Sequence, residues 1–212
     1  MKFYALTSIL LLGFVINRAI RLTNKHENDI MQEFLDREDE ANNTPLKSTE
    51  DLHFITIGDS LPIDIPLQNP AASSIQKTLS SLKQREILNL TDFSNTDIKI
   101  AYGTANMERL GSADANYLVM QRSLKTLSAL YEKEGYITEA IALREFEIAT
   151  GGSDMQAFMY LKEYYLKQND INSMEKLLNS AEQSTDNRVY TYADEIRSSL
   201  ELMEIMNGAS NE

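Results

Sequence analysis

A 34-residue repeat constrains the fold of this chain more than any other feature. Residues 124–140 (LKTLSALYEKEGYITEA) align with residues 158–174 (FMYLKEYYLKQNDINSM). Large apolar residues recur at the first, fourth and eighth positions of both segments, which is the stripe of an amphipathic helix. A polar turn follows, with Gly135 in the first copy and Asn169 in the second, and another helical segment comes after it. The pattern predicts two consecutive helical hairpins.

Packing explains why such hairpins would occur together. Each hairpin has an apolar face that it cannot bury alone, and a neighbour of the same shape covers that face. About three repeats are needed for stability, so we expect flanking helices to complete the stack. The paired positions are Leu124 with Phe158, Leu127 with Leu161, Tyr131 with Tyr165, Ile137 with Ile171, and Ala140 with Met174. The expected flanking stripes are Ile75, Leu79 and Leu82 before the repeats, and Tyr192, Ile196, Leu200 and Met203 after them.

The first copy resembles the tetratricopeptide repeat (TPR) family, whose unit is a helix–turn–helix with a period of 34 residues. The string Leu124-x2-Leu127-Ser128-x2-Tyr131 is similar to the first helix of that family, with Leu for the usual Trp and Ser for the usual Gly. The resemblance covers two repeats, about residues 118–184. It implies a short α-solenoid of stacked hairpins.

The second helix of the first copy departs from the family pattern at three positions. Arg144 stands where an aromatic residue is expected, Glu147 where an alanine is expected, and Gly152 replaces the closing proline. In the second copy Met174 replaces the alanine, although Leu178 and Ala181 fit the pattern.

The resemblance also implies a binding surface. In the TPR family the first helices of the hairpins line a concave groove that commonly binds peptides or protein partners. Some members hold a C-terminal carboxylate with Lys and Asn side chains; Lys125 suits this role, but Ala129 stands where the Asn would be needed. Tyr160 is the best candidate for an aromatic residue that faces a partner. The alternative is that these side chains are merely solvated. The predicted groove residues are Arg122, Lys125, Ala129, Met159, Tyr160, Glu163 and Lys167.

The N-terminus is the most apolar part of the chain. Residues 3–16 (FYALTSILLLGFVI) contain no charge and would extend over about 21 Å as a helix at ~1.5 Å per residue. That length is short of a hydrocarbon core of roughly 30 Å, but Arg18 and Arg21 could reach the headgroups and lengthen the span. The segment predicts an uncleaved membrane anchor over residues 1–22. The positive charges that follow it favour a cytoplasmic location for the bulk of the chain.

A secretory signal peptide is the alternative reading of this segment, because its apolar region has a similar length. The run is followed by Asn17-Arg18-Ala19-Ile20-Arg21 and not by a cleavage site of small residues. We therefore favour the anchor.

Charge and composition exclude several classes of function. After residue 22 the chain has 17 basic and 32 acidic side chains, a net charge of −15. Such a field repels nucleic acids, whose affinity for proteins depends on Lys and Arg. The absence of Cys excludes disulfides, thiolate metal sites and Cys nucleophiles. His26 and His53 are the only histidines, which makes most zinc enzymes and His-based triads implausible. We predict no cofactor, no metal site and no small-molecule substrate.

The middle of the chain is less regular. Residues 26–51 are polar and acidic, with a short helix predicted at their start and a loop by Asn42. Residues 54–57 (FITI) resemble a short strand or an extended segment, and Ile98 and Ile100 alternate as in a strand. Asn69-Pro70 predicts a helix start, with Asn as the N-cap and Pro in the first turn.

One string in this region suggests catalysis. Gly58-Asp59-Ser60-Leu61 is similar to the GDSL signature of the SGNH hydrolases, which implies Ser60 as a nucleophile. A serine nucleophile needs a base within hydrogen-bonding reach, and in that family the base is a His nearer the C-terminus. The sequence has no histidine after His53, so we interpret the string as a turn.

Taken together, these features predict an all-α protein with TPR-like hairpins, a capping helix, an irregular middle region and an N-terminal membrane helix. We expect a non-enzymatic, membrane-anchored adaptor that binds a protein or peptide. The alternatives are a structural subunit of a membrane assembly, with contacts from the middle region, and a hydrolase that uses Ser60. The expected segments are a membrane anchor (1–22), an acidic juxtamembrane linker (23–52), an irregular region with one helix (53–115), the TPR-like domain (116–206) and a disordered tail (207–212).

Overall fold

All regular secondary structure described in the chain is helical, as the sequence predicts. The structure is a computed structural model and describes residues 2–209; the end of the predicted tail, residues 210–212, lies outside them. The helices are α1 (Lys2–Asn43), α2 (Pro70–Leu82), α3 (Asn95–Tyr102), the 3₁₀ helix η1 (Thr104–Asn106), α4 (Met107–Glu134), α5 (Ile137–Ala149), α6 (Met155–Gln168), α7 (Ile171–Glu182) and α8 (Asn187–Ala209).

The chain divides into two compact units. The first comprises residues 1–50 and 93–107, and the second comprises residues 51–92 and 108–212. Each unit therefore contains two separate stretches of sequence. We describe them one at a time.

In the first unit the end of α1 packs against α3. Arg37 forms an ion pair with Asp97 at 2.5 Å, and Lys99 Nζ donates to Asn42 Oδ1 at 2.7 Å. Ala41 is fully buried at this contact. The loop predicted at Asn42 begins at the end of α1, so most of the predicted linker is helical.

α3 begins with a capping box, in a segment where the alternation of Ile98 and Ile100 predicted a strand. The Ser94 side chain accepts a hydrogen bond from the Asp97 N–H, and the Asp97 side chain accepts one from the Ser94 N–H. These reciprocal bonds satisfy two backbone donors that a helix start leaves free. The strand prediction was wrong because local capping outweighed a two-residue alternation.

The predicted membrane span is not supported. Within the described residues no helix is both long enough and apolar enough to cross a bilayer. The uncharged run ends at Ile16, and Asn17, Arg18 and Arg21 follow on the same helix. These polar residues lower the mean hydropathy of any window long enough to span the hydrocarbon core.

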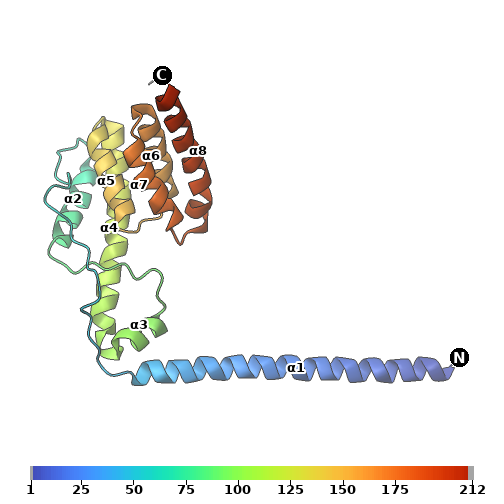
Figure 1. Cartoon of the computed structure of the whole chain (residues 1–212). Helices are drawn as coiled ribbons and strands as arrows, with labels where there is room; N and C mark the ends of the chain where they lie inside the picture. Colours follow the sequence, from blue (N-terminus) through green and yellow to red (C-terminus); the bar gives the residue numbers. More distant parts are fainter. Residues whose placement is uncertain (1, 210–212) are drawn as a thin grey trace. The chain divides into compact units, whose positions relative to one another are not determined.

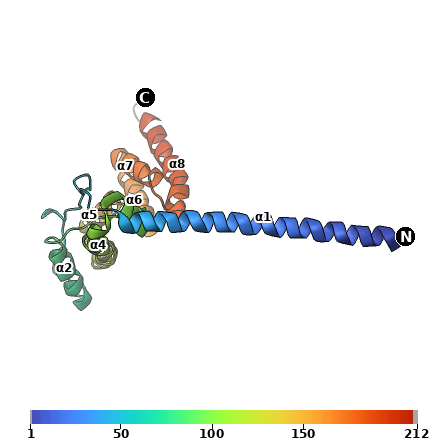
Figure 2. The same ribbon diagram turned by 90° about the horizontal axis from the view of Figure 1, so that it is seen from below.

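The second unit contains helical hairpins joined by short turns. α4 and α5 form the first hairpin, and α6 and α7 form the second (Figure 1). α8 contacts both α6 and α7, and the three helices lie side by side also in the perpendicular view of Figure 2. The unit is thus a stack of antiparallel helices, in which each element covers the apolar face of the one before it.

The turns of the two hairpins have the same hydrogen bonds at a spacing of 34 residues. The Tyr136 N–H donates to Tyr131 O at 2.9 Å, and the Asp170 N–H donates to Tyr165 O at 3.0 Å. Both turns contain a residue with positive φ, Gly135 in the first and Asn169 in the second. A bond of this kind over a positive-φ residue caps the C-terminus of a helix. The following helices also begin 34 residues apart, at Ile137 and Ile171.

The first hydrophobic cluster joins α2 to the first hairpin. Buried Leu79 and Leu82 of α2 pack with Leu124, Leu127 and Tyr131 of α4. α2 begins as predicted, because the Asn69 side chain accepts a hydrogen bond from the Ala71 N–H and Pro70 occupies the first turn. The expected helix at this end of the stack is therefore present.

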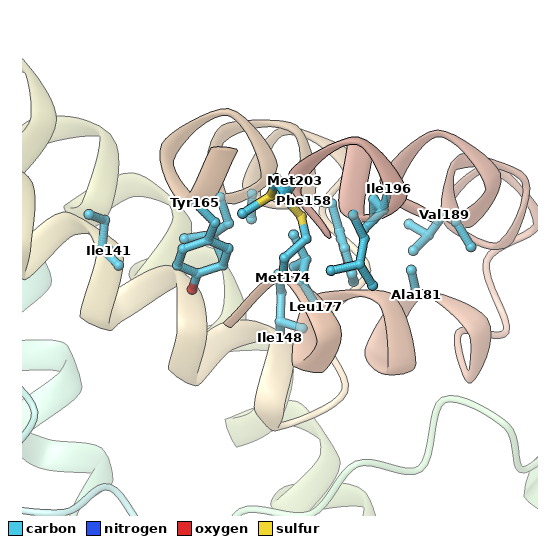
Figure 3. Close-up of a cluster of buried hydrophobic side chains, with 14 residues drawn as sticks. Ile141, Ile148, Phe158, Tyr165, Met174, Leu177, Ala181, Val189, Ile196 and Met203 are labelled. Carbon is cyan, nitrogen blue, oxygen red and sulfur yellow. The ribbon is translucent and has the colours of Figure 1, made fainter. Parts of the chain in front are cut away.

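The second cluster joins α5, α6, α7 and α8. Figure 3 shows Phe158 and Tyr165 of α6 facing Met174 and Leu177 of α7, with side chains of α8 closing the cluster. Ile196, Leu200 and Met203 of α8 are buried here, as the predicted final stripe requires. α8 continues through Ala209, so residues 207–209 are helical, although the sequence predicted a disordered tail from residue 207 onward.

The segment before α2 is extended but is not a strand. The Ile55 N–H donates to Ile87 O at 2.8 Å, and the Ile65 N–H donates to the Tyr131 hydroxyl at 3.3 Å. Ile57 and Ile63 are buried in the first cluster. Of the two structures predicted for residues 54–57, the structure has the extended segment and not the strand, and side-chain burial against helices holds it in place.

Candidate binding site

The predicted groove residues lie on two helices. Arg122, Lys125 and Ala129 are exposed on α4, and Met159, Glu163 and Lys167 are exposed on α6. Their exposure is what the predicted binding groove requires. Contact of these side chains with a partner stays a prediction.

Tyr160 differs from the other predicted residues because its ring is already covered. The Arg144 guanidinium lies 3.7 Å from the centre of the Tyr160 ring, within the range of a cation–π contact. Arg144 is itself buried and forms an ion pair with Glu132 at 2.5 Å. One face of the Tyr160 ring therefore stabilises the joint between the two hairpins.

A polar cavity lies beside Arg122 and Lys125. Its volume is about 540 Å³, within the range of ligand pockets, roughly 300–1,000 Å³. Its walls come from α4, from the end of α5 and the turn to α6, from the turn between α7 and α8, and from residues 89–92. This cavity brings together segments that are far apart in the sequence and is the candidate binding site.

Two glycines allow the α5–α6 turn to approach α4. Gly151 has φ of 87°, a conformation that L side chains rarely adopt, and a Cβ there would lie 2.5 Å from Asn89 Nδ2. A Cβ on Gly152 would lie 2.6 Å from both Gln121 Oε1 and Glu147 O. No side chain fits at either position without movement of its neighbours. The turn therefore forms a wall of the cavity with bare backbone.

The Gln121 side chain links α4 to this turn. Its Nε2 donates to Glu147 O at 3.3 Å and to Thr150 Oγ1 at 3.0 Å. Its Oε1 is buried and accepts no hydrogen bond from any described residue. Such a buried acceptor costs about 1–3 kcal/mol when it stays unpaired.

Glu147 is the most unusual side chain of the site. It is 2 % exposed, and its Oε2 has no hydrogen-bond partner in the described part of the chain. Burial raises the pKa of Glu147 to about 8, and the negative charge of Asp154 adds to this shift. Lys125 and Arg144 lower the pKa but do not cancel the effect of burial. At neutral pH the carboxyl group is therefore mostly protonated.

Tyr117 lies one turn before Gln121 on α4. Its hydroxyl accepts a hydrogen bond from Asn89 Nδ2 at 3.1 Å, which holds residues 89–92 against α4. Burial raises the pKa of Tyr117 to about 12, so the hydroxyl stays neutral. Tyr117 is thus a structural and hydrogen-bonding element of the wall.

The two basic side chains at the cavity differ in their partners. Lys125 forms an ion pair with Asp154 at 2.8 Å. Asp154 also caps α6, because its side chain accepts a hydrogen bond from the Gln156 N–H. Arg122 is exposed and forms no ion pair with any residue between 2 and 209. Lys125 is therefore neutralised locally, whereas no described acidic side chain neutralises Arg122.

The GDSL-like string forms a turn. The Leu61 N–H donates to Gly58 O at 3.2 Å, and Asp59 forms an ion pair with Lys83 at 2.9 Å. Ser60 and His53 are both exposed. Among the residues that the structure describes, no group of acidic or histidine side chains is arranged to hold a metal ion.

Sequence reasoning located only part of this cavity. Arg122 and Lys125 were predicted, whereas Tyr117 and Gln121 were missed. Glu147 and Gly152 were noticed only as departures from a repeat pattern. An acidic residue on the apolar face of a helix, followed by a Gly-Gly turn, was the signal that could have located the site.

Comparisons of the chain with protein-family models, with curated proteins and with solved structures found no match. The functional argument therefore depends on the geometry of the chain itself.

Proposed function

We propose that this protein is a non-catalytic adaptor that binds a protein or peptide partner through TPR-like helical hairpins. The single observation that carries the proposal is the repeated turn. Tyr131 and Tyr165 are both buried, and both accept a backbone hydrogen bond from the residue five positions later. Repeated hairpins of this kind stack into extended surfaces that suit the binding of another chain.

The exposed faces of α4 and α6 supply the proposed contact surface. Met159 is 48 % exposed although it is apolar, and Glu163 and Lys167 follow it at intervals of four residues along the same helix. Residues four apart lie on one face of a helix. An apolar centre with charged neighbours is typical of protein interfaces.

Charge supports the choice of partner. The chain after residue 22 has a net charge of −15, so its field attracts basic proteins and repels nucleic acids. We propose a partner with a basic contact surface.

Site-specific photocrosslinking tests this proposal in cells. A photoreactive amino acid replaces Met159 or Ala129 on the proposed surface, and matched control proteins carry it at exposed Glu175 or Asn179 of α7. We expect one discrete crosslinked protein from the first pair of positions and none from the controls. Crosslinks that are equally strong from α7, or absent from α4 and α6, would contradict the proposed surface.

Location in the cell is a separate proposal from sequence alone. We propose association with a membrane through residues 3–22, because residues 3–16 are apolar and uncharged and are followed by Arg18 and Arg21. Cell fractionation with protease protection tests both the association and its direction. Recovery of the full-length chain in the soluble fraction would reject it.

A further inference from the structure

We propose that the polar cavity beside α4 binds one cationic side chain, a lysine or an arginine, of the partner protein. The inference rests on the proposed function and specifies which chemical group of the partner the adaptor recognises. It is carried by the charges, the unpaired acceptors and the size of the cavity.

The charges that line the cavity balance only when Glu147 is neutral. The acidic side chains are Asp92, Glu147 and Asp154, and the basic ones are Arg122 and Lys125. With Glu147 protonated the lining has no net charge. With Glu147 ionised it has one net negative charge, which a single monovalent cation would neutralise.

One buried oxygen in the wall, Gln121 Oε1, lacks a hydrogen-bond donor, and Glu147 Oε2 needs one when the carboxyl group is ionised. Gln121 Oε1 and Glu147 Oε2 have no partner among the described residues, although both side chains line the cavity. Ammonium and guanidinium groups are donors only, with three and five N–H groups respectively. With Glu147 ionised, a carboxylate or phosphate would bring further acceptors and further negative charge to oxygens that already lack donors. The chemistry of the wall therefore selects a cation over an anion.

Size and position agree with a side chain as the ligand. A volume of about 540 Å³ accommodates a long side chain together with water, and is small for a folded element. Arg122 and Lys125 belong both to the cavity and to the proposed contact surface of α4. A partner on that surface could place one side chain in the cavity without unfolding any element.

Binding of a cation must be coupled to the release of a proton. The charged and titratable groups that act on Glu147 are Asp154, Lys125 and Arg144, and the charge of Glu147 in turn acts on Tyr117. A bound cation would favour the ionised carboxylate and lower the pKa of Glu147 below its value in the free protein. The proton that Glu147 holds at neutral pH would then leave. Affinity should therefore rise with pH up to about 8 and level off above it.

Calorimetry and NMR test the inference on the full chain. The probes are N-acetyl-arginine methylamide and N-acetyl-lysine methylamide, with the neutral N-acetyl-citrulline methylamide as the matched control. We expect saturable shifts of the Gly151 and Gly152 amide signals with both cationic probes and none with citrulline. Titrations at pH 7 in phosphate and Tris buffers should show release of about one proton per bound cation.

Two variants identify the carboxyl group responsible. Glu147→Gln keeps the shape of the side chain but cannot ionise, so we expect loss of proton release and binding weaker by at least about tenfold. Glu175→Gln removes an exposed carboxylate from α7 and should leave both quantities unchanged.

Three results would overturn the inference. They are equal shifts from citrulline, no shift at Gly151 and Gly152 from either cation, and unaltered proton release in Glu147→Gln. The citrulline comparison uses the unmodified chain, so it decides the question even if Glu147→Gln fails to fold. Crosslinks at Met159 in the absence of cation binding would reject this inference alone and leave the proposed function standing.

Discussion

Tyr131 and Tyr165 occupy equivalent positions in two hairpins, but their hydroxyl groups have different partners. The Tyr131 hydroxyl accepts hydrogen bonds from the Ile65 N–H and from Gln76 Nε2, at 3.3 and 3.4 Å. The Tyr165 hydroxyl donates to Glu145 Oε1 at 2.5 Å. The repeated backbone thus presents the same side chain to an extended segment in one hairpin and to the preceding helix in the other.

Removal of the Tyr165 hydroxyl should destabilise the contact between the hairpins. Tyr165→Phe loses a hydrogen bond to a charged acceptor, and we expect the free energy of unfolding to fall by about 1–2 kcal/mol. Urea denaturation measures the change. Tyr190→Phe is the control. Tyr190 is 57 % exposed, so loss of its hydroxyl group should change the free energy of unfolding by less than about 0.5 kcal/mol. Equal losses in the two variants would show that the Glu145 contact is not stabilising.

Glycine-to-alanine substitutions should have opposite effects at two positions. Gly152→Ala places a Cβ 2.6 Å from Gln121 Oε1, and we expect a loss of about 1–3 kcal/mol from the required shifts. Gly111→Ala lies in α4 with no atom within 4 Å of the new Cβ, so it should gain about 0.5–1 kcal/mol from helix propensity. Thermal unfolding monitored by circular dichroism distinguishes the two. A stabilised Gly152→Ala protein would contradict the close approach described for this turn.

Stability should fall with rising pH because of Glu147. The folded-state pKa of about 8 lies above the ordinary glutamate pKa of 4.5, so the folded chain holds a proton that the unfolded chain releases between these values. The free energy of unfolding therefore decreases from about pH 5 to about pH 8 and is constant above that range. We expect Glu147→Gln to be more stable than the unmodified chain by roughly 2–4 kcal/mol at pH 8.5, and the difference to vanish near pH 5. Denaturation curves of both proteins at pH 5 and pH 8.5 measure this difference in the free energy of unfolding. A difference that is the same at both pH values would exclude titration of Glu147.

Loss of the capping box should loosen α3 locally. Ser94→Ala removes the side chain that accepts from the Asp97 N–H, and an N-cap of this type contributes about 1 kcal/mol. Amide hydrogen exchange within Asn95–Tyr102 should accelerate about fivefold in the variant. Ser112→Ala, an exposed change in α4, should leave these amides unaffected. Unchanged exchange in α3 would mean that packing against α1 alone holds the helix.

The hairpins and their turns could be predicted from local sequence alone. A helix that is apolar on one face and a positive-φ turn are local properties, encoded within about ten residues around Tyr131 and again around Tyr165. The start of α2 was predictable for the same reason, because Asn69 and Pro70 act on the first turn that follows them. Local signals failed at α3, where the capping pair Ser94 and Asp97 was overlooked in favour of an apolar alternation.

The position of the polar cavity and the set of side chains that line it depend on how the helices pack in three dimensions. Its wall combines Asn89, Gln121 and Glu147 with Gly152, four residues from three separate stretches of chain. No periodicity relates these positions, and the burial of Glu147 depends on how closely the α5–α6 turn approaches α4. Burial and the lack of a partner give this carboxyl group its raised pKa, and both are properties of the packed chain. Local interactions thus specify the helices, whereas the chemistry of the site arises from contacts that only folding creates.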